Sequence, residues 1–300
     1  MTGPGFARTL VIGGSGFIGR HLVPFLKKDP FYGEIVAPSR AELDLGDQDR
    51  LCQVLADIKP TSIINLAGYA TIRSVDVADL FGRNTVSVVN LLSAVARLQQ
   101  RPRIIVCSSA YVYAANATEK LTENSLLEPR NLYAVSKVAA EMSISITKGD
   151  LDVTTVRIFN ATGVGQSTEF LLPKVISTLV FGNLPLFLNN LSDRRDFIDV
   201  RDLCQMFSVV LKTSAPPPVI NFCNGCSVSI SQIIDTLSGL VGFSIPVASS
   251  NSSSRTSTVQ GDNSLLRSLG YQRRYQMVDT LSWMLAHAEQ SKNIVNKSSP

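Results

Sequence analysis

Histidine, tryptophan and closely spaced cysteine pairs are scarce in this 300-residue sequence. It holds two histidines, one tryptophan and five cysteines, and only Cys223 and Cys226 have the spacing of a metal or redox pair. Because a closed zinc site needs four such ligands, we expect no structural zinc. We interpret Cys223–Cys226 as a strand end followed by an Asn-Gly turn.

Long apolar runs and blocks of basic charge are missing as well. No apolar segment approaches the roughly 20 residues of a membrane helix, and the N-terminal residues lack the apolar region of a signal peptide. The 28 basic residues are interspersed with 24 acidic ones, so no basic tract can follow a phosphate backbone. We therefore expect a cytoplasmic protein that binds neither membranes nor nucleic acid.

Size and patterning favour an α/β protein of two domains. With 45% hydrophobic and 17% charged residues, the chain can bury a core. In the first half, short β-branched runs alternate with helical patterns, which is typical of βαβ units and a parallel sheet. We expect strands at 8–12, 34–37, 61–65, 103–107 and 152–158, and helices near 17–28, 47–57, 76–100 and 131–147.

The pattern becomes less regular after residue 160, where a second lobe is expected to begin. We assign residues 1–160 and about 199–222 to the parallel-sheet domain. A smaller C-terminal substrate-binding lobe would then comprise about 161–198 and 223–300. It includes the polar, serine-rich loop 249–257, which suits either a lid or a linker.

A glycine-rich turn follows the first expected strand and precedes a helix. Glycines at this spacing allow a tight turn and a close approach of the backbone, and the helix N-terminus then receives a pyrophosphate. The candidate cofactor-binding residues of this segment are Gly13, Ser15, Gly16, Phe17, Ile18 and Gly19.

The end of the second expected strand bears on the choice of cofactor. An acidic residue there would grip the ribose 2′-hydroxyl of NAD, but the chain has Ser39 and Arg40. A hydroxyl and a guanidinium suit a 2′-phosphate, so we favour NADP, with NAD as the alternative. Asp44 and Leu45 follow and could meet the adenine, although Asp44 could equally cap a turn.

Tyr133 and Lys137 lie four residues apart and therefore on one face of an expected helix. A cation within ~4–6 Å favours a phenolate, so we expect Lys137 to lower the pKa of Tyr133. Ser109 ends the preceding strand, at the sheet edge where ligands bind, and can hold a carbonyl oxygen while Tyr133 supplies a proton. Ser108 and Ser109 could alternatively cap the strand end.

Together these motifs resemble the extended short-chain dehydrogenase/reductases that act on nucleotide-diphosphate sugars. The resemblance extends over nearly the whole chain and is also carried by Asn65-Leu-Ala-Gly68, Asn84, Arg157-Ile-Phe-Asn160 and Arg195-Asp-Phe-Ile-Asp-Val200. It implies a Rossmann-like, doubly wound parallel sheet, a nicotinamide cofactor whose ribose is held by Tyr133 and Lys137, and a homodimer formed through the helices near 76–100 and 131–147. Further implied cofactor contacts are Leu66, Ala67, Gly68, Asn84, Ser108 and Phe159. Implied substrate contacts are Ser109, Ala110, Tyr133, Asn160, Arg195 and Arg255.

Members of this family perform several reactions on one scaffold, so individual substitutions must distinguish them. Ala110 and Tyr111 stand where the family's 4,6-dehydratases carry acidic residues, and Ala110 also replaces the cysteine of the 3,5-epimerising reductases. Two reactions remain: reduction of an NDP-4-keto-6-deoxyhexose by NADPH, and C4 epimerisation with tightly held NAD. Ser39 and Arg40 favour the reductase, with Ser109, Tyr133 and Lys137 as catalytic residues. A regulator that binds the cofactor without catalysis would be expected to lack Tyr133 and Lys137.

Overall fold

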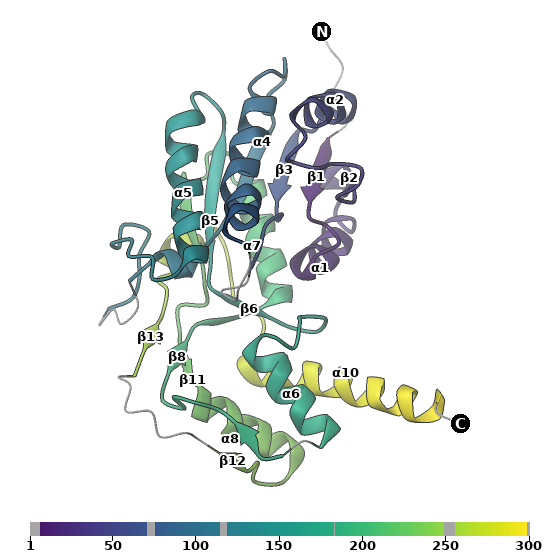
Figure 1. Cartoon of the computed structure of the whole chain (residues 1–300), viewed down its shortest axis with the longest axis vertical. Coiled ribbons are helices and arrows are strands. Elements are labelled where there is room, and N and C mark those ends of the chain that lie inside the picture. Colours follow the sequence, from purple (N-terminus) through teal and green to yellow (C-terminus); the bar gives the residue numbers. More distant parts are fainter. Residues whose placement is uncertain (1–6, 71–75, 115–118, 183, 249–255, 299–300) are drawn as a thin grey trace. The chain divides into compact units, whose positions relative to one another are not determined.

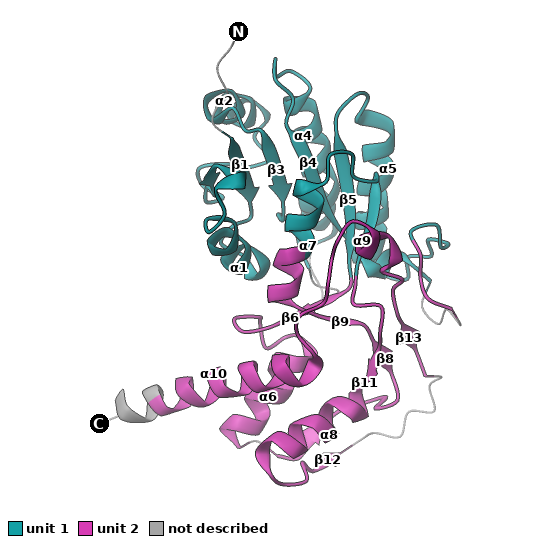
Figure 2. Ribbon diagram, turned by 180° about the vertical axis from the view of Figure 1, so that it is seen from behind, with its two compact units in different colours: residues 1–114, 123–158, 206–222 teal, residues 115–122, 159–205, 223–300 magenta. Residues whose placement is uncertain are grey.

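The chain forms two compact units, which are described here separately (Figures 1 and 2). The structure, a computed structural model, describes residues 7–70, 76–114, 119–182, 184–248 and 256–298. Unit 1 comprises residues 1–114, 123–158 and 206–222, and unit 2 comprises residues 115–122, 159–205 and 223–300. Within the described ranges, every helix is too short or too polar to cross a bilayer.

Unit 1 is built on a parallel six-stranded sheet in the order β10-β5-β4-β3-β1-β2. This confirms the expected doubly wound α/β fold. The strand order reverses at β1, whose neighbours are β2 and β3, and ligands bind at such a switch point beyond the carboxyl ends of the strands. The strands are β1 (Arg8–Ile12), β2 (Glu34–Val36), β3 (Ser62–Asn65), β4 (Arg103–Ser109), β5 (Val153–Ile158) and β10 (Val219–Phe222).

Helices cover the sheet of unit 1 with leucine-rich faces. Leu51, Leu91 and Ile144 pack into one cluster with Leu10 and Ile104 of the strands, and all five are buried. The helices and short turns are α1 (Phe17–Leu26), η1 (Pro30–Tyr32), α2 (Gln48–Ile58), α3 (Val77–Phe81), η2 (Gly82–Val86), α4 (Ser87–Val95), η3 (Ala110–Val112), α5 (Leu132–Thr147) and α7 (Val200–Lys212). The segment expected as one helix at 76–100 therefore contains the π-helical turn η2 and ends its last helix at Val95.

Unit 2 consists of small sheets and three longer helices. Its strands are β6 (Asn160–Thr162), which pairs with β9 (Phe197–Asp199), β8 (Arg194–Arg195), which pairs with β11 (Val228–Ser229) and β13 (Thr258–Val259), and β7 (Leu186–Phe187), which pairs with β12 (Val247–Ala248). Its helices are α6 (Leu171–Phe181), α8 (Ile230–Val241), α9 (Ser264–Ser268) and α10 (Met277–Ser298). Buried leucines and isoleucines of α6, α8 and α10 form its core.

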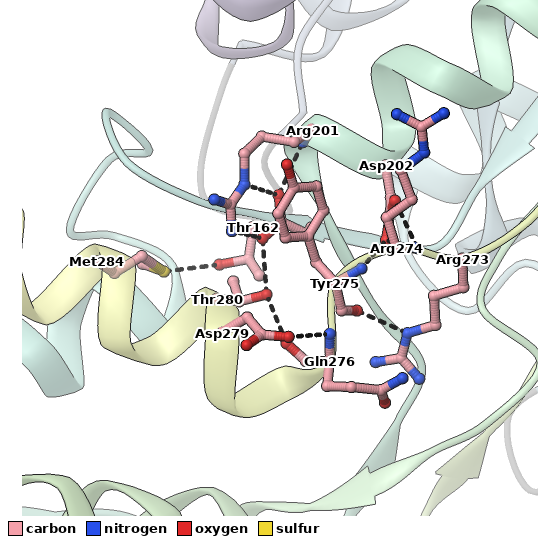
Figure 3. A network of polar contacts seen from close by, with 11 residues as sticks. Thr162, Arg201, Asp202, Arg273, Arg274, Tyr275, Gln276, Asp279, Thr280 and Met284 are labelled. Atoms are coloured by element: carbon pink, nitrogen blue, oxygen red, sulfur yellow. Dashed lines mark hydrogen bonds and ion pairs between the residues drawn. The ribbon is translucent and has the colours of Figure 1, made fainter.

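The start of α7 belongs to a polar network within unit 2 (Figure 3). The Arg201 guanidinium lies 3.6 Å from the ring centroid of Tyr275 and 4.1 Å from that of Trp283. The Asp202 carboxylate accepts the N–H of Tyr275 at 3.0 Å. These contacts are why residues 199–205, which the sequence analysis assigns to the parallel-sheet domain, group with unit 2.

Candidate active site

The glycine-rich turn lies between β1 and α1 and is packed too tightly for side chains. Gly13 has a φ of +81°, and a Cβ there would lie 3.0 Å from the carbonyl carbon of Leu66. A Cβ on Gly19 would lie 2.5 Å from the Cα of Gly14. Gly16 is the N-cap of α1 and has no side chain that could cap the helix. The N–H groups of the first helical turn therefore receive no hydrogen-bond acceptor from the cap residue. The residues present therefore fit a pyrophosphate bound at this helix N-terminus.

The loop after β2 contains a carboxylate that the sequence analysis missed. Glu42 accepts the N–H of Ser39 at 2.7 Å, and this bond, together with the Ser39 hydroxyl, lowers the pKa of Glu42. A backbone turn brings the Glu42 carboxylate back to the end of β2. The spacing of residues after the strand could not predict this contact. Arg40 forms an exposed ion pair with Asp44 at 3.5 Å, while Leu45 is buried. Both polar residues predicted to bind a 2′-phosphate thus lie beside carboxylates.

The loop at 66–68 passes beside the ammonium of Lys137. A Cβ on Gly68 would lie 2.6 Å from Oδ1 of Asn84 and 3.5 Å from Nζ of Lys137. Asn84 is buried in the π-helical turn, where it accepts the N–H of Tyr69 at 2.8 Å and donates to Oγ of Ser136 at 3.0 Å. The amide of Asn84, predicted as a cofactor contact, thereby ties the loop to α5.

The three predicted catalytic residues lie on two neighbouring elements: Ser109 ends β4, and Tyr133 and Lys137 lie one turn apart on α5. Asn131 caps α5 by accepting the N–H of Ala134 at 2.8 Å, which places Tyr133 in the first turn. The Ser109 side chain is near enough to the Tyr133 hydroxyl to lower the pKa of the phenol. Nζ of Lys137 donates to the carbonyl oxygen of Cys107 at 3.0 Å. A hydroxyl pair beside an ammonium can hold and protonate a carbonyl oxygen.

The protonation of Tyr133 differs from the expectation that Lys137 lowers its pKa. Burial raises the pKa of Tyr133 to about 12, opposed by the hydrogen bond from Ser109. Burial also lowers the pKa of the Lys137 ammonium. The physical reason is that both groups are removed from water, which disfavours the charged form of each. Tyr133 is therefore a neutral phenol at neutral pH.

Two further predicted residues of unit 1 are Ser108 in β4 and Ala110 in η3. The Ser108 hydroxyl donates to the Glu141 carboxylate, and Ser108 is buried. Ala110 is buried, and Tyr111 is exposed with its ring centroid 6.1 Å from that of Tyr133. Neither position carries an acid, as the sequence shows.

Asn160 of β6 and Arg195 of β8 both belong to unit 2. Asn160 donates from both its backbone and its side chain to the carbonyl oxygen of Asp196, at 3.1 Å each. The neighbouring Arg195 donates to the carbonyl oxygen of Ser257 at 2.7 Å and pairs with Asp193 at 3.2 Å. The predicted cofactor contact Phe159 is buried, and the predicted substrate contact Arg255 lies outside the described residues.

Comparisons with known proteins relate this chain to a family. Residues 9–223 match the NAD dependent epimerase/dehydratase family. The chain is 31% identical over 231 residues to GDP-6-deoxy-D-talose 4-dehydrogenase of Aggregatibacter actinomycetemcomitans, covering 77% of this chain and 79% of that protein. It is 29% identical over 252 residues to GDP-6-deoxy-D-mannose reductase of Pseudomonas aeruginosa, covering 80% of this chain and 82% of that protein.

A solved structure shows the same architecture. The structure of RMD from Pseudomonas aeruginosa complexed with NADPH is similar to this chain with a TM-score of 0.83 and 26% identity, covering 95% of this chain and 99% of that one. The glycine-rich turn, the Ser109–Tyr133–Lys137 arrangement and the match over residues 9–223 agree with one another. The chain belongs to the NAD dependent epimerase/dehydratase family.

Proposed function

We propose that this protein reduces the 4-keto group of an NDP-4-keto-6-deoxyhexose with NADPH. The observation that carries the proposal is the buried phenol of Tyr133 in the first turn of α5, with the Ser109 side chain near enough to affect its pKa. Reduction of a ketone needs a proton donor for the developing alkoxide, and a phenol that keeps its proton at neutral pH fills this role. The related enzymes named GDP-6-deoxy-D-mannose reductase and GDP-6-deoxy-D-talose 4-dehydrogenase support the same substrate class.

In this mechanism the side chains hold the ketone and deliver a proton. Bound NADPH supplies the hydride to C4 of the sugar. The Ser109 hydroxyl donates a hydrogen bond to the C4 oxygen, and the Tyr133 hydroxyl transfers its proton to that oxygen. Lys137 would bind the ribose hydroxyls of the cofactor.

Binding is divided between the two units in this proposal. The turn at 13–19, the loop at 39–45 and the loop at 66–68 of unit 1 bind the cofactor. Asn160 and Arg195 of unit 2 bind the nucleotide diphosphate, for which a guanidinium fork is suited. Ala110 would border the sugar, and Arg255 would add a second phosphate contact.

One observation favours the alternative function, a 4-epimerase with tightly held NAD. Glu42 takes the N–H of Ser39, and a carboxylate in this loop suits the 2′-hydroxyl of NAD. Against it, an epimerase must first remove a proton from its substrate, which a phenol with its pKa raised to about 12 does poorly. A regulator without catalysis would have no need of the assembled proton donor.

The test is the absorbance of NADPH, and in parallel of NADH, during incubation with GDP-, dTDP-, CDP- and UDP-4-keto-6-deoxyhexoses generated in situ. Oxidation of NADPH with one of them establishes the reductase and identifies its nucleotide. If no reduced cofactor is consumed, but purified protein carries NAD and interconverts C4 epimers, the protein is the epimerase instead.

We also propose a cytoplasmic homodimer. Leu132, Val135, Met142 and Ile146 are exposed along one stripe of α5, although they are apolar. A second copy of α5 would cover this stripe in an isologous interface. A particle of twice the 32.5 kDa chain mass in light scattering, lost in Met142→Glu, would support it. The five cysteines form no disulfide bond, which fits a reducing compartment.

A further inference from the structure

A buried ion pair lies behind the proton-transfer residues in unit 1. Arg157 of β5 and Glu141 of α5 pair at 2.7 Å, with side chains only 6% and 9% exposed. Nε of Arg157 also contacts both carboxylate oxygens, at 3.1 and 3.2 Å. The Ser108 hydroxyl donates to the same carboxylate. Glu141 is therefore held from β4 and β5 at once.

The other end of Arg157 is also fixed. Its Nη1 donates to the Tyr113 hydroxyl at 2.9 Å and to the carbonyl oxygen of Glu123 at 2.8 Å. The Tyr113 hydroxyl in turn donates to Oδ1 of Asn221 at 2.6 Å. A guanidinium with this many partners cannot turn away from Glu141 without leaving buried polar groups unsatisfied.

Glu141 lies one helical turn beyond Lys137, so the two side chains are neighbours on α5. The Lys137 side chain is buried, which lowers the pKa of its ammonium, and the Glu141 carboxylate acts in the opposite direction. Ser108, the partner of Glu141, directly precedes Ser109 on β4. Glu141 is therefore one helical turn from Lys137 on α5, and through Ser108 it is bonded next to Ser109 at the end of β4.

We propose that Glu141, held in place by Arg157, is a positioning residue that keeps Lys137 charged and holds the Tyr133–Lys137 face of α5 against the end of β4. The inference rests on the proposed binding of the cofactor by Lys137. It adds a residue that acts through Lys137 and touches neither cofactor nor substrate.

Within the described ranges, the other groups that act on Lys137 carry no negative charge, so Glu141 is its counter-charge. From β4, the Cys107 thiol is neutral, because burial raises its pKa to about 12. On α5 itself, Tyr133 is a neutral phenol. The loop after β3 and the π-helical turn present the uncharged Gly68 and Asn84. Arg157 of β5 pairs with Glu141, so its positive charge would be left without this partner once the carboxylate is removed.

This arrangement predicts effects of opposite sign for the two charges. Glu141→Gln leaves the buried Arg157 charge uncompensated and should make Lys137 lose its proton at lower pH. The double variant Glu141→Gln/Arg157→Gln removes both charges and should return the titration toward that of the natural protein. A role confined to packing would instead make the double variant worse than the single one. Glu128→Gln is the matched control, because Glu128 pairs with Arg130 at an exposed site.

The experiment follows the ε-carbon of Lys137 by NMR in protein labelled at lysine, with the signal identified by its loss in Lys137→Met. NADPH affinity is measured on the same proteins by fluorescence. Glu141→Gln should lower the titration midpoint and weaken NADPH binding about tenfold near pH 10, with affinity unchanged near pH 7. Glu128→Gln should match the natural protein throughout. If Glu141→Gln does not fold, Glu141→Asp is measured in its place. It should shift the titration midpoint of Lys137 in the same direction, but by less.

An unchanged midpoint in folded Glu141→Gln, or a double variant further from the natural protein than the single one, would overturn the inference. The NMR titration needs no ligand, so it reports on Glu141 even if NADPH does not bind. Failure of the natural protein to bind or oxidise NADPH would refute the proposed function, whereas a shifted midpoint would still establish the coupling of Glu141 to Lys137.

Discussion

Replacing Tyr133 by phenylalanine tests the mechanism most directly. The change removes one oxygen atom from a buried ring and leaves the packing of α5 in place. Because burial raises the pKa of Tyr133 to about 12, only ~1 in 10⁵ molecules has a phenolate at pH 7. The Tyr133 hydroxyl therefore almost always carries the proton that the alkoxide needs. Tyr133→Phe leaves the Ser109 hydroxyl to hold the oxygen but nothing to protonate it.

A positioned general acid contributes about 10²- to 10⁴-fold to the rate, which corresponds to roughly 3–5 kcal/mol of barrier. We expect kcat of Tyr133→Phe to fall by that factor. The affinity for NADPH should fall by about tenfold at most, because a single hydrogen bond to the ribose is lost. Stopped-flow absorbance of NADPH gives the rate, and fluorescence titration gives the affinity.

Tyr111→Phe is the matched control, since it removes the same oxygen from an exposed ring 6.1 Å away. It should keep the rate of the natural protein. The reasoning is refuted if Tyr133→Phe retains more than about a tenth of the activity, because a tenfold loss is too small for the removal of the proton donor. A parallel loss in both variants would also refute it, since it would indicate general damage to the site.

Three further predictions concern the cofactor and stability. Glu42→Gln should raise kcat/KM for NADPH relative to NADH, because it removes a negative charge that would repel a 2′-phosphate beside Ser39; an unchanged ratio would show that this loop does not select the cofactor. Gly19→Ala should abolish NADPH binding or folding, because its Cβ would lie 2.5 Å from Gly14, and normal binding by calorimetry would contradict the tight turn. Burial raises the pKa of Asp196 to about 7, so the folded protein binds a proton that the unfolded chain has released above about pH 4. Stability in urea unfolding should therefore fall by up to about 4 kcal/mol as pH rises from about 4 to 7, and a flat profile in that window would count against it.

The strands and the catalytic segments follow from local patterns in the sequence. The strand-turn-helix at 8–26 is recognisable because glycine spacing and β-branched runs are properties of adjacent residues. Tyr133 and Lys137 share a face of α5 because of the helical repeat, whatever surrounds the helix. The order Ser109, Tyr133 and Lys137 could therefore be identified, and the fold of the family with it.

Other features depended on contacts between distant segments. Glu42 lies three residues beyond the expected contact, and only the turn of the backbone returns it to Ser39. The π-helical turn directs the amide of Asn84, a predicted cofactor contact, to Tyr69 and Ser136. Such details arise from chain reversals and helix irregularities that no period of the sequence encodes.

The sequence by itself determined the parallel sheet and the glycine-rich turn, and it singled out Ser109, Tyr133 and Lys137 as candidates for proton transfer, because these features depend on residue type and short-range spacing. Only the tertiary structure decided their charge states. Burial of Tyr133 gives a neutral phenol where an isolated Tyr-Lys pair suggests a phenolate, and the pairing of Glu141 with Arg157 joins residues 16 positions apart. Burial and long-range pairing are collective properties of the folded chain, and they set the free energy of each ionised group.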